Sequence, residues 1–575
     1  MTRGAETKQQ TARRFTGRVT LIAVFFGLLA SSLIARAVHL QVFNKDFLNQ
    51  QADARHLRVE KISAHRGTIT DRNGEPLAIS TPVDSIWANP KELAPAVDDV
   101  PQLARVLGVD SQQLIRRITR SMDKEFLYLK RRLSPEKAKE VLALKLPGIN
   151  VQREYRRYYP AGEVAGHLIG FTDIDDDGQE GLELAFNHWL AGEMGAKRVL
   201  KDRHGRSVEN VESIRPPHHG KELRTSIDLR IQYVAYRTLK SAIQTHSAES
   251  GSIVVLDVQT GEVLAIVNQP TYNPNDRSQF TAERYRNRAI TDIFEPGSSI
   301  KPLVVAAALE SGEYRPSSVI DTAPGYVVVG PKTIEDGRNL GRISLTTILA
   351  RSSNVGATKL AMSLQSDQLW NTMTQFGLGS LTASGFPGES AGLLTHFNHW
   401  RPISQATLAY GYGLSVTPLQ LAQAYGVLGS NGQLRPISLV ALDQPAEGDQ
   451  IISQDSATAV RRMLEEVVRP GGTGTGAAVT GYRIAGKTGT SWKFAAGGYS
   501  KDKYISVFAG LAPASNPRLA AVVVIDEPAG ELYYGGDVAA PVFADVMSES
   551  LRLLAVPPDA LPARDPGSII QAMSR

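Results

Sequence analysis

The pattern of hydrophobic and polar positions begins with one long apolar segment near the N-terminus. Residues 19–35 are 17 residues without a charge, and a basic stretch precedes them. As a helix with a rise of about 1.5 Å per residue, this segment spans roughly 25 Å, slightly less than a bilayer core, and it can extend to residue 42. The pattern therefore predicts a transmembrane helix over residues 19–42 after a basic tail, residues 1–18.

Basic residues before the span predict that residues 1–18 are cytoplasmic and that the chain after residue 42 lies outside the membrane. A cleaved signal peptide is the alternative, because Ala35-Arg36-Ala37 loosely fits a small-x-small cleavage site. The apolar run is longer than the core of a usual signal peptide, which favours an uncleaved anchor.

The patterning after the membrane segment predicts two globular parts. Residues 43–220 mix short alternating segments with charged helical stretches at 103–122 and 134–146. A stiff, polar sequence, Arg215-Pro216-Pro217-His218-His219-Gly220, then predicts a domain boundary. We expect a second domain over residues 221–555, followed by a flexible C-terminal tail at 556–575.

The second domain alternates apolar strands with helices. An N-cap signal at Thr225-Ser226-Ile227-Asp228 predicts a first helix, and residues 540–554 predict a last one. The strands of one antiparallel sheet are expected at 253–256, 263–267, 483–490, 504–511 and 519–525. The fold class is therefore α+β, with this sheet flanked by helices and an all-helical insert over residues 298–470.

Composition narrows the class of protein. The 575 residues are too many for one ordinary domain, and the absence of cysteine excludes disulfides, cysteine nucleophiles and thiolate metal sites. Residues 1–18 carry five basic residues against one acidic residue, which is +4 of the net charge of +5. The sequence pI of 9.1 is thus mostly a property of the tail, and it gives no support for a nucleic-acid surface.

Residues 43–220 contain no cluster of residues typical of catalysis. The histidines there are scattered, and the acidic run at Asp173, Asp175, Asp176 and Asp177 lacks the glutamate at position twelve of a calcium loop. We interpret this run as a solvated turn, and we expect no metal site.

Three motifs in the second domain carry the candidate chemistry. They are Ser298-Ser299-Ile300-Lys301, Ser352-Ser353-Asn354 and Lys487-Thr488-Gly489-Thr490. Each motif alone is common by chance, but together and in this order they are the residue set of a serine acyltransferase that moves protons with lysine. Because the motifs are 54 and 135 residues apart, only the fold can bring them together.

The first motif places a nucleophile beside a base. Ser298 and Lys301 are three residues apart, so on a helix their Cβ atoms are roughly 5–6 Å apart and a hydrogen bond between them is expected. Pro302 predicts a tight first turn before the regular helix. Burial and a nearby positive charge from Lys487 would lower the pKa of Lys301 and leave it partly neutral.

The third motif is expected on an edge strand beside the first. Thr488 and Thr490 can face a groove there, Lys487 supplies positive charge for an anionic substrate end, and Gly489 permits close approach. The backbone N–H groups of Ser298 and Thr490 would form an oxyanion hole, whose loss typically costs about 10²–10³ in rate.

These motifs resemble those of the class B penicillin-binding proteins, the monofunctional peptidoglycan D,D-transpeptidases, most of all the cell-division branch of Gram-negative bacteria. The resemblance covers nearly the whole chain and includes the segments 66–74, 157–160, 167–170, 178–183, 411–418 and 472–475. It implies that residues 43–220 are a non-catalytic pedestal. It also implies cross-linking of peptidoglycan stem peptides through a serine acyl-enzyme during septal wall synthesis, with β-lactams acylating the same serine.

The resemblance implies the following roles, with no cofactor. Ser298 is the nucleophile, Lys301 the base, Ser352 a proton relay backed by Lys487, and Asn354 orients Lys301 and the substrate amide. The substrate-binding positions are Ser353, Thr488, Gly489, Thr490, Tyr504 and Tyr534, although Tyr504 and Tyr534 could equally pack between strands. The implied partners are an FtsW-type glycosyltransferase and other divisome proteins at the inner membrane.

Four alternatives stay open at this point. A serine β-lactamase would need a carboxylate to activate water, and Glu389 lies 35 residues after Asn354. A D,D-carboxypeptidase would pass the acyl group to water. A transpeptidase of cell elongation would share every motif, and a membrane-bound receptor or scaffold could use the site only to sense β-lactams.

Overall fold

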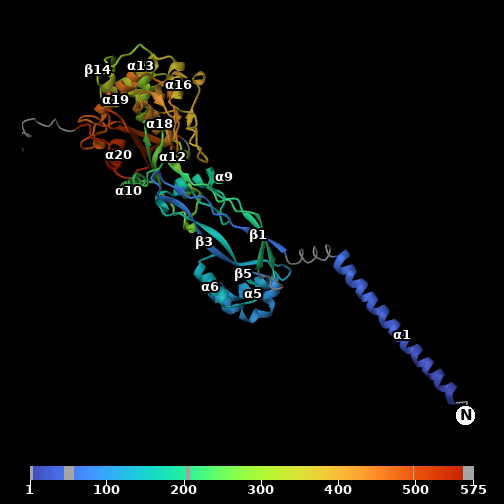
Figure 1. Ribbon diagram of the computed structural model, residues 1–575. Helices are drawn as coiled ribbons and strands as arrows, with labels where there is room; N and C mark the ends of the chain where they lie inside the picture. Colours follow the sequence, from blue (N-terminus) through green and yellow to red (C-terminus); the bar gives the residue numbers. More distant parts are fainter. Residues whose placement is uncertain (1–3, 45–56, 202–206, 496–497, 561–575) are drawn as a thin grey trace, which may run out of the picture. The chain divides into compact units, whose positions relative to one another are not determined.

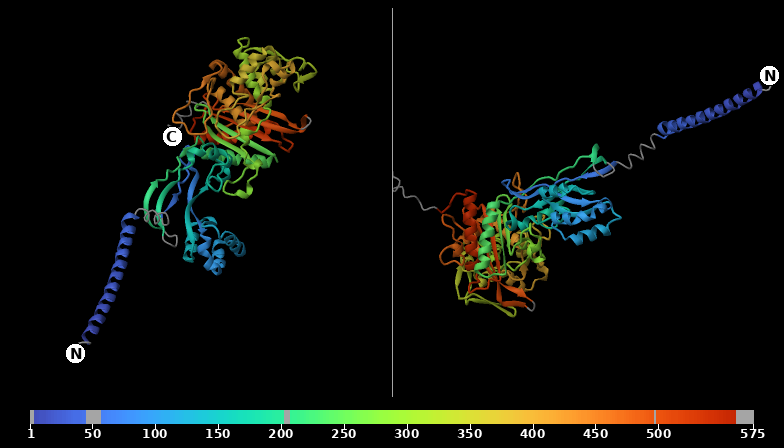
Figure 2. Two further views of the ribbon diagram at one scale, coloured as in Figure 1. Left: turned by 90° about the vertical axis from the view of Figure 1, so that its right-hand side faces the viewer. Right: turned by 90° about the horizontal axis from the view of Figure 1, so that it is seen from below.

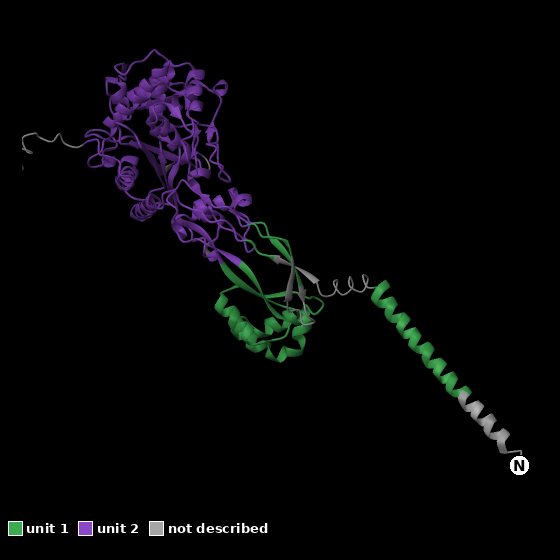
Figure 3. Ribbon diagram, viewed as in Figure 1, with its two compact units in different colours: residues 1–64, 82–154, 193–218 green, residues 65–81, 155–192, 219–575 purple. Residues whose placement is uncertain are grey.

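The computed structural model describes residues 4–44, 57–201, 207–495 and 498–560 (Figure 1). The chain packs as two compact units (Figure 3). Unit 1 contains residues 1–64, 82–154 and 193–218, and unit 2 contains residues 65–81, 155–192 and 219–575. Two segments of the expected pedestal therefore pack within unit 2, so the boundary of packing is not a single break at residue 220.

The N-terminal helix α1 (Gly4–Val38) continues into a short π-helical turn, η1 (His39–Phe43). Within the described residues, Gly17–Phe43 is the one helical segment long and apolar enough to cross a membrane. Its large apolar side chains, among them Leu21 and Phe26, are exposed. The helix expected from the apolar run is therefore present, with the length that a single membrane span requires.

Unit 1 combines strands with short helices. An antiparallel sheet joins β1 (Leu57–Ile62), β6 (Gly195–Lys201) and β7 (Ser207–Arg215). A second core lies where β4 (Leu127–Leu133) packs with α3 (Pro90–Leu93), α4 (Val100–Leu107), α5 (Ser111–Arg120) and α6 (Pro135–Ala143).

The helical stretch expected at 103–122 is broken into α4 and α5. Gly108 adopts a left-handed conformation with φ of 63° and ends α4. Asp110 then accepts a hydrogen bond from the Gln113 N–H and caps α5. A glycine C-cap followed by an aspartate N-cap is the combination that separates two helices, so the stretch turns here.

Unit 2 contains a five-stranded antiparallel sheet in the order β10-β9-β21-β20-β19. The strands are β9 (Ser250–Asp257), β10 (Val263–Gln269), β19 (Ala485–Ala495), β20 (Gly498–Ala512) and β21 (Leu519–Asp526). Their positions confirm the strands expected from the sequence, and β19 is an edge strand as predicted.

Helices cover both faces of this sheet, because successive residues of a strand point to opposite sides. Ile253 and Val255 of β9 pack with α10 (Leu229–Thr245) and α20 (Gly535–Leu553), which run side by side in the right-hand view of Figure 2. Val254 and Leu256 face the opposite core, which includes α18 (Pro418–Gly429).

The insert of unit 2 is rich in helix but is not all-helical. Its helices are α13 (Lys301–Glu310), α14 (Leu345–Ala350), α15 (Asn354–Ser363), α16 (Ser366–Gln375), α17 (Pro402–Leu408), α18 and α19 (Gln454–Val468). Two-stranded ladders join β11 (Val319–Asp321) to β14 (Arg342–Ser344) and β12 (Tyr326–Val329) to β13 (Lys332–Glu335). The turn at Gly330, with φ of 57°, allows the β12–β13 hairpin that the sequence reading missed.

The chain beyond α20 stays attached to unit 2. The Val556 carbonyl accepts a hydrogen bond from Tyr482, and the Asp559 carboxylate accepts from the Arg483 N–H and from Ser515. The flexible tail expected from residue 556 therefore does not begin before residue 561, and 561–575 lie outside the described residues.

A buried ionic network lies within unit 2. Glu183 is fully buried and accepts hydrogen bonds from the Nε atoms of Arg66, at 2.5 Å, and Arg157, at 2.6 Å. Arg66 also donates to the Asn187 side chain at 2.7 Å. The carboxylate therefore joins two segments that are more than 90 residues apart in sequence.

We predict that Glu183→Gln lowers the free energy of unfolding by about 3–5 kcal/mol, because it leaves two buried guanidinium groups without their counter-ion. Urea unfolding of the solubilised protein measures this loss. The matched control is Glu283→Gln, an exposed carboxylate of the same unit, which should change stability by less than about 0.5 kcal/mol. Equal effects of the two substitutions would contradict the role given to the network.

Candidate active site

The first motif forms a tight turn that leads into a buried helix. Residues Gly297–Ile300 are a 3-10 turn and α13 begins at Lys301, which confirms the predicted tight turn to within one residue. Ser299 Oγ donates to the Pro296 carbonyl at 2.7 Å, and the hydroxyl of Tyr425 donates to the Ser299 carbonyl at 2.8 Å. These bonds fix the turn that presents the half-buried Ser298.

The edge strand β19 lies directly against this turn. A Cβ atom on Gly297, which has a φ of 55°, would lie 3.4 Å from the backbone nitrogen of Thr490, and one on Gly489 would lie 2.6 Å from the Pro296 carbonyl oxygen. Glycine at both positions therefore allows the two backbones to approach. This contact brings the backbone of Thr490 next to the turn that carries Ser298, as an oxyanion hole made by these two residues requires.

Lys301 is fully buried, and its amine is directed toward the second motif. Nζ donates to the Ser352 carbonyl at 2.6 Å, to Ser352 Oγ at 3.2 Å and to Asn354 Oδ1 at 2.7 Å. Within the part of the chain that the structure describes, the Lys301 amine is not hydrogen-bonded to Ser298 Oγ. The direct bond expected from the sequence spacing is therefore not formed. An ammonium group has three donors, and the second motif accepts all three.

Ser352 is the point where the motifs meet. Its Oγ accepts from Lys301 and also from Lys487 Nζ, which lies 3.0 Å away. Its φ of 56° is in the left-handed region, which a serine adopts at a cost of about 1–3 kcal/mol. The surrounding structure therefore holds this hydroxyl between two amines that are 186 residues apart in sequence.

Lys487 is also fully buried, on β19. Its Nζ donates to Thr488 Oγ1 at 3.2 Å and to the Thr488 carbonyl at 3.0 Å. Thr488 Oγ1 in turn shares a hydrogen bond with Thr473 at 2.9 Å, and Thr490 Oγ1 accepts from the Gly535 N–H at 3.0 Å. The third motif is thus held from both sides.

Burial and mutual repulsion set the charge of the two amines. Burial lowers the pKa of Lys301 well below its usual value, the positive charge of Lys487 lowers it further, and Asp336 opposes the change. Burial lowers the pKa of Lys487 to about 7. A neutral amine near Ser352 and Ser298 is therefore accessible near neutral pH, which general-base catalysis by lysine requires.

The two tyrosines proposed from the sequence belong to one aromatic stack. Tyr504 stacks on Tyr533 with ring centroids 4.1 Å apart, and Tyr533 lies 4.4 Å from Tyr534. Tyr534 is 55% exposed and precedes α20, whose first N–H binds Thr490. Tyr534 thus adjoins the residue that binds the third motif, and Tyr533, whose ring lies between those of Tyr504 and Tyr534, was missed.

Glu389, the carboxylate that a β-lactamase would need, is committed to its own loop. One oxygen accepts from the N–H of Thr382 at 2.6 Å and from its hydroxyl, and the other accepts from Ser384 at 2.9 Å. Both oxygens therefore stabilise the loop instead of pointing a free acceptor at water.

Three residues of the site, Thr473, Tyr533 and Asp336, were not predicted as site residues from the sequence. Thr473 stood in a family signature, and Tyr533 adjoins the proposed Tyr534. Asp336 had no local signal, because its hydrogen bonds to Ser353 and Asn354 of the second motif join residues 17 and 18 positions apart in sequence.

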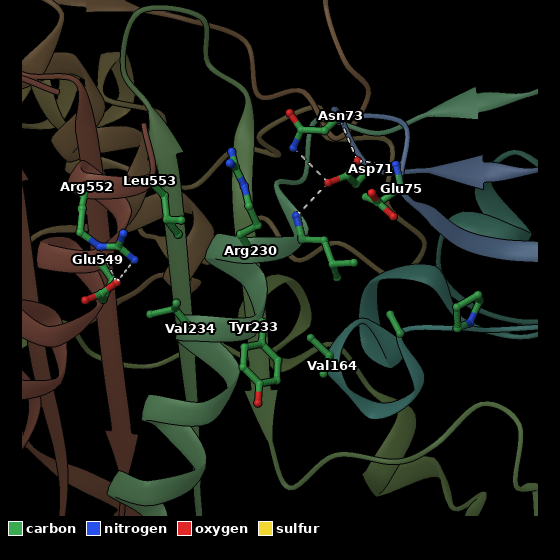
Figure 4. A pocket seen from close by; sticks show the side chains of 13 residues that line it. Asp71, Asn73, Glu75, Val164, Arg230, Tyr233, Val234, Glu549, Arg552 and Leu553 are labelled. Carbon is green, nitrogen blue, oxygen red and sulfur yellow. Dashed lines mark hydrogen bonds and ion pairs between the residues drawn. The ribbon is translucent and has the colours of Figure 1, made fainter. Parts of the chain in front are cut away.

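A separate groove of unit 2, of about 880 Å³, contains none of the motif residues (Figure 4). Arg230 and Tyr233 of α10, Glu549 and Arg552 of α20, and Asp71 line it. Glu549 and Arg552 pair with each other at 2.7 Å, and Asp71 accepts from the N–H of Leu229. Its polar groups include the hydrogen-bonded pairs Asp71–Asn73 and Glu549–Arg552.

The fold and the converging serine and lysines define a serine acyltransferase of the penicillin-binding class. Comparison with family models agrees: residues 251–548 match the penicillin-binding protein transpeptidase domain, and residues 61–225 match the penicillin-binding protein dimerisation domain.

Relatives match along nearly the whole chain. The chain is 44% identical to the peptidoglycan D,D-transpeptidase FtsI of Escherichia coli K12 over 99% of its length and 97% of that protein. It is 42% identical to the probable peptidoglycan D,D-transpeptidase PenA of Neisseria meningitidis serogroup A, over 94% of each chain. A crystal structure of a peptidoglycan synthetase from Bifidobacterium adolescentis matches 88% of this chain and 98% of its own, with a TM-score of 0.71 at 26% identity.

The chain therefore belongs to the class B penicillin-binding proteins. It is a peptidoglycan D,D-transpeptidase, whose transpeptidase domain implies peptide substrates and β-lactam binding.

We predict that the buried charge of Lys487 makes folding stability depend on pH. The pKa of about 7 lies below the ordinary value of 10.5, so between these values the unfolded chain binds more protons and the free energy of unfolding rises with pH. Relative to Lys487→Met, the wild type should gain about 1.4 kcal/mol per pH unit above pH 7.

Chemical unfolding of both proteins from pH 6 to pH 9 measures this difference. Lys139→Met, which removes an exposed lysine, is the control and should follow the wild type at every pH. Parallel curves for the wild type and Lys487→Met would contradict the lowered pKa.

Proposed function

We propose that this protein cross-links peptidoglycan stem peptides at the division septum through an acyl-enzyme on Ser298. The observation that supports it best is the meeting of Lys301 and Lys487 at Ser352 Oγ, beside the turn that carries Ser298. The 44% identity to FtsI over almost the whole chain supports the septal role.

Acylation begins with removal of the Ser298 proton. Neutral Lys301 accepts this proton as the Ser298 oxygen attacks the carbonyl carbon of the penultimate D-alanine. In the free protein Lys301 is hydrogen-bonded to Ser352 and Asn354, and bonds of a catalytic base often tighten only when substrate is bound. The oxyanion lies between the N–H groups of Ser298 and Thr490.

The leaving D-alanine needs a proton on its amine. Ser352 donates its own proton to that nitrogen and recovers one from Lys301 or Lys487, both of which are hydrogen-bonded to its Oγ. Asn354 holds the Lys301 amine and offers its amide to the substrate backbone. The amine of a second stem peptide then attacks the ester carbonyl, its proton passes through Lys301 to the Ser298 oxygen as the ester C–O bond breaks, and the cross-link forms.

The rim of the site binds the substrate. Lys487 supplies positive charge, and Thr488 and Thr490 supply hydroxyls, for the terminal carboxylate. Ser353 and Gly489 shape the groove, and Tyr504 and Tyr534 contribute apolar surface at its end. β-Lactams acylate Ser298 because their strained amide resembles the D-alanyl-D-alanine end of the donor.

We infer a single-pass protein of the bacterial inner membrane. The span Gly17–Phe43 follows a basic segment, so the N-terminus is cytoplasmic and the transpeptidase domain periplasmic. An FtsW-type glycosyltransferase and other divisome proteins are the expected partners, which the likeness to FtsI supports.

We predict that Ser298→Ala abolishes covalent labelling by fluorescent penicillin while the protein stays folded. Ser299→Ala is the matched control: the Ser299 hydroxyl donates to the Pro296 carbonyl and the variant keeps the backbone bond from Tyr425, so labelling should stay within about tenfold of the wild type. Undiminished labelling of Ser298→Ala would contradict the assigned nucleophile.

We further predict that the penicillin adduct persists for many minutes, since Glu389 is not free to activate water. Pulse labelling followed by a chase with unlabelled β-lactam measures its lifetime. Turnover of the adduct within seconds would favour a β-lactamase. Hydrolysis of a peptide donor at a rate and with products that an added acceptor amine does not change would favour a carboxypeptidase.

The septal role predicts mid-cell localisation of a fluorescent fusion in dividing cells. A side-wall pattern would favour the elongation alternative. Normal septation supported by Ser298→Ala would favour the non-catalytic sensor or scaffold.

A further inference from the structure

We propose that Asp336, which lies outside the three motifs, is a positioning residue for acylation: its carboxylate fixes the Ser352–Asn354 segment and acts electrostatically on Lys301. This inference rests on the proposed function of Ser298 and Lys301, and it adds a fourth segment, from the insert, to the three motifs of their site.

The hydrogen bonds of the Asp336 carboxylate go to the start of α15. Oδ2 accepts from the hydroxyl of Ser353 at 2.5 Å, and Oδ1 accepts from the N–H groups of Asn354, at 2.6 Å, and Val355, at 3.1 Å. These amides belong to the first turn of a helix and have no partner within it. A carboxylate there also interacts favourably with the helix dipole.

Ser353 completes the cap. Its oxygen accepts from the Gly356 N–H at 2.9 Å while its hydroxyl proton is directed to Asp336. One carboxylate therefore binds two backbone amides directly and orients the hydroxyl that caps a third. Ser353, which its motif predicts as a substrate-binding position, thus uses its hydroxyl both to donate and to accept within the protein.

The strand arrangement holds Asp336 at this place. It follows β13, which pairs with β12, and its own N–H donates to the Gly325 carbonyl at 2.9 Å. Ile334 of β13 is 4% exposed and anchors the hairpin in the core. The carboxylate thus reaches α15 from the end of a paired strand whose position the hairpin and the core hold.

The fixed segment supplies the three acceptors of Lys301. Ser352 gives its carbonyl and hydroxyl, and Asn354 gives its side-chain oxygen. Ser352 adopts its unfavourable φ of 56° immediately before the residue that Asp336 binds. Weakening the hold of Asp336 should therefore let the segment relax and move all three acceptors away from the amine.

Charge gives a second route from Asp336 to Lys301. The charged groups that act on Lys301 are Lys487 of β19, which lowers its pKa, and Asp336, which raises it. On α15 and α19, which pack against α13, three charged side chains bind other partners: Lys359 donates to the Asp321 carbonyl, Arg461 donates to the Leu428 carbonyl, and Glu465 accepts from Arg483. Removing the charge of Asp336 should therefore lower the pKa of Lys301.

The pKa of Lys301 sets the pH below which acylation slows. Lys301 accepts a proton only when neutral, so the acylation rate falls as pH drops through its pKa. A lower pKa moves this acid limb to lower pH. A residue that merely stabilises the fold would reduce the rate without moving the limb, so the two roles give different profiles.

The test is the second-order rate constant for acylation by fluorescent penicillin, measured on the full-length solubilised protein across the pH range. For Asp336→Asn we expect the rate constant at its high-pH plateau to be about 10- to 100-fold lower, because the charge-assisted hydrogen bonds are weakened. We also expect its decline on the acid side to occur at lower pH. Asp336→Glu keeps the charge with a longer side chain, so its plateau should fall while its acid limb stays in place.

Glu335→Gln is the matched control. It removes the same charge one residue away, from an exposed side chain, and should keep both plateau and limb. An Asp336→Asn profile equal to that of the wild type, or lowered with an unmoved limb, would overturn the proposal. A wild type that penicillin does not label would instead overturn the proposed function.

Discussion

The site depends on one constraint: two buried amines are held within hydrogen-bonding distance of the same serine hydroxyl. Lys301 and Lys487 are both fully buried, and both donate to Ser352 Oγ. Taking two like charges out of water is costly, and the folded protein reduces this cost by lowering the pKa values. Burial of the amines therefore lowers the free energy of unfolding, and it leaves an amine that is neutral near physiological pH and can act as a base.

The fold meets this constraint by joining a sheet edge to a helical insert. Strand β19 brings Lys487, α13 brings Lys301, and the segment before α15 brings Ser352. Glycine favours the junction, because a Cβ atom at Gly489 would collide with the Pro296 carbonyl oxygen and because Gly297 has a φ of 55°, which glycine adopts without strain. The buried strands of the sheet and the helices on both faces then fix the edge to which these segments attach.

Local patterns predicted much of this architecture. The apolar runs located the membrane helix and four strands of the main sheet, because burial imposes periodicity on the sequence. The fifth strand was placed beside them from the context of the third motif. Contacts between distant segments were predicted less well. The spacing of Ser298 and Lys301 suggested a direct hydrogen bond, yet the amine binds Ser352 and Asn354, whose position only the tertiary fold determines. Asp336 was missed for the same reason. The insert was expected to contain only helices, but it also contains the β12–β13 hairpin, which turns at Gly330.

The most direct measurement is the titration of the two lysines themselves, followed by NMR of protein labelled at the lysine Cε and assigned with Lys301→Met and Lys487→Met. The account predicts one lysine signal that titrates near pH 7, from Lys487, and a second, from Lys301, that titrates far below its usual 10.5. Two signals that both titrate near pH 10 would contradict it, because neither amine could then serve as a neutral base at the pH of the cell.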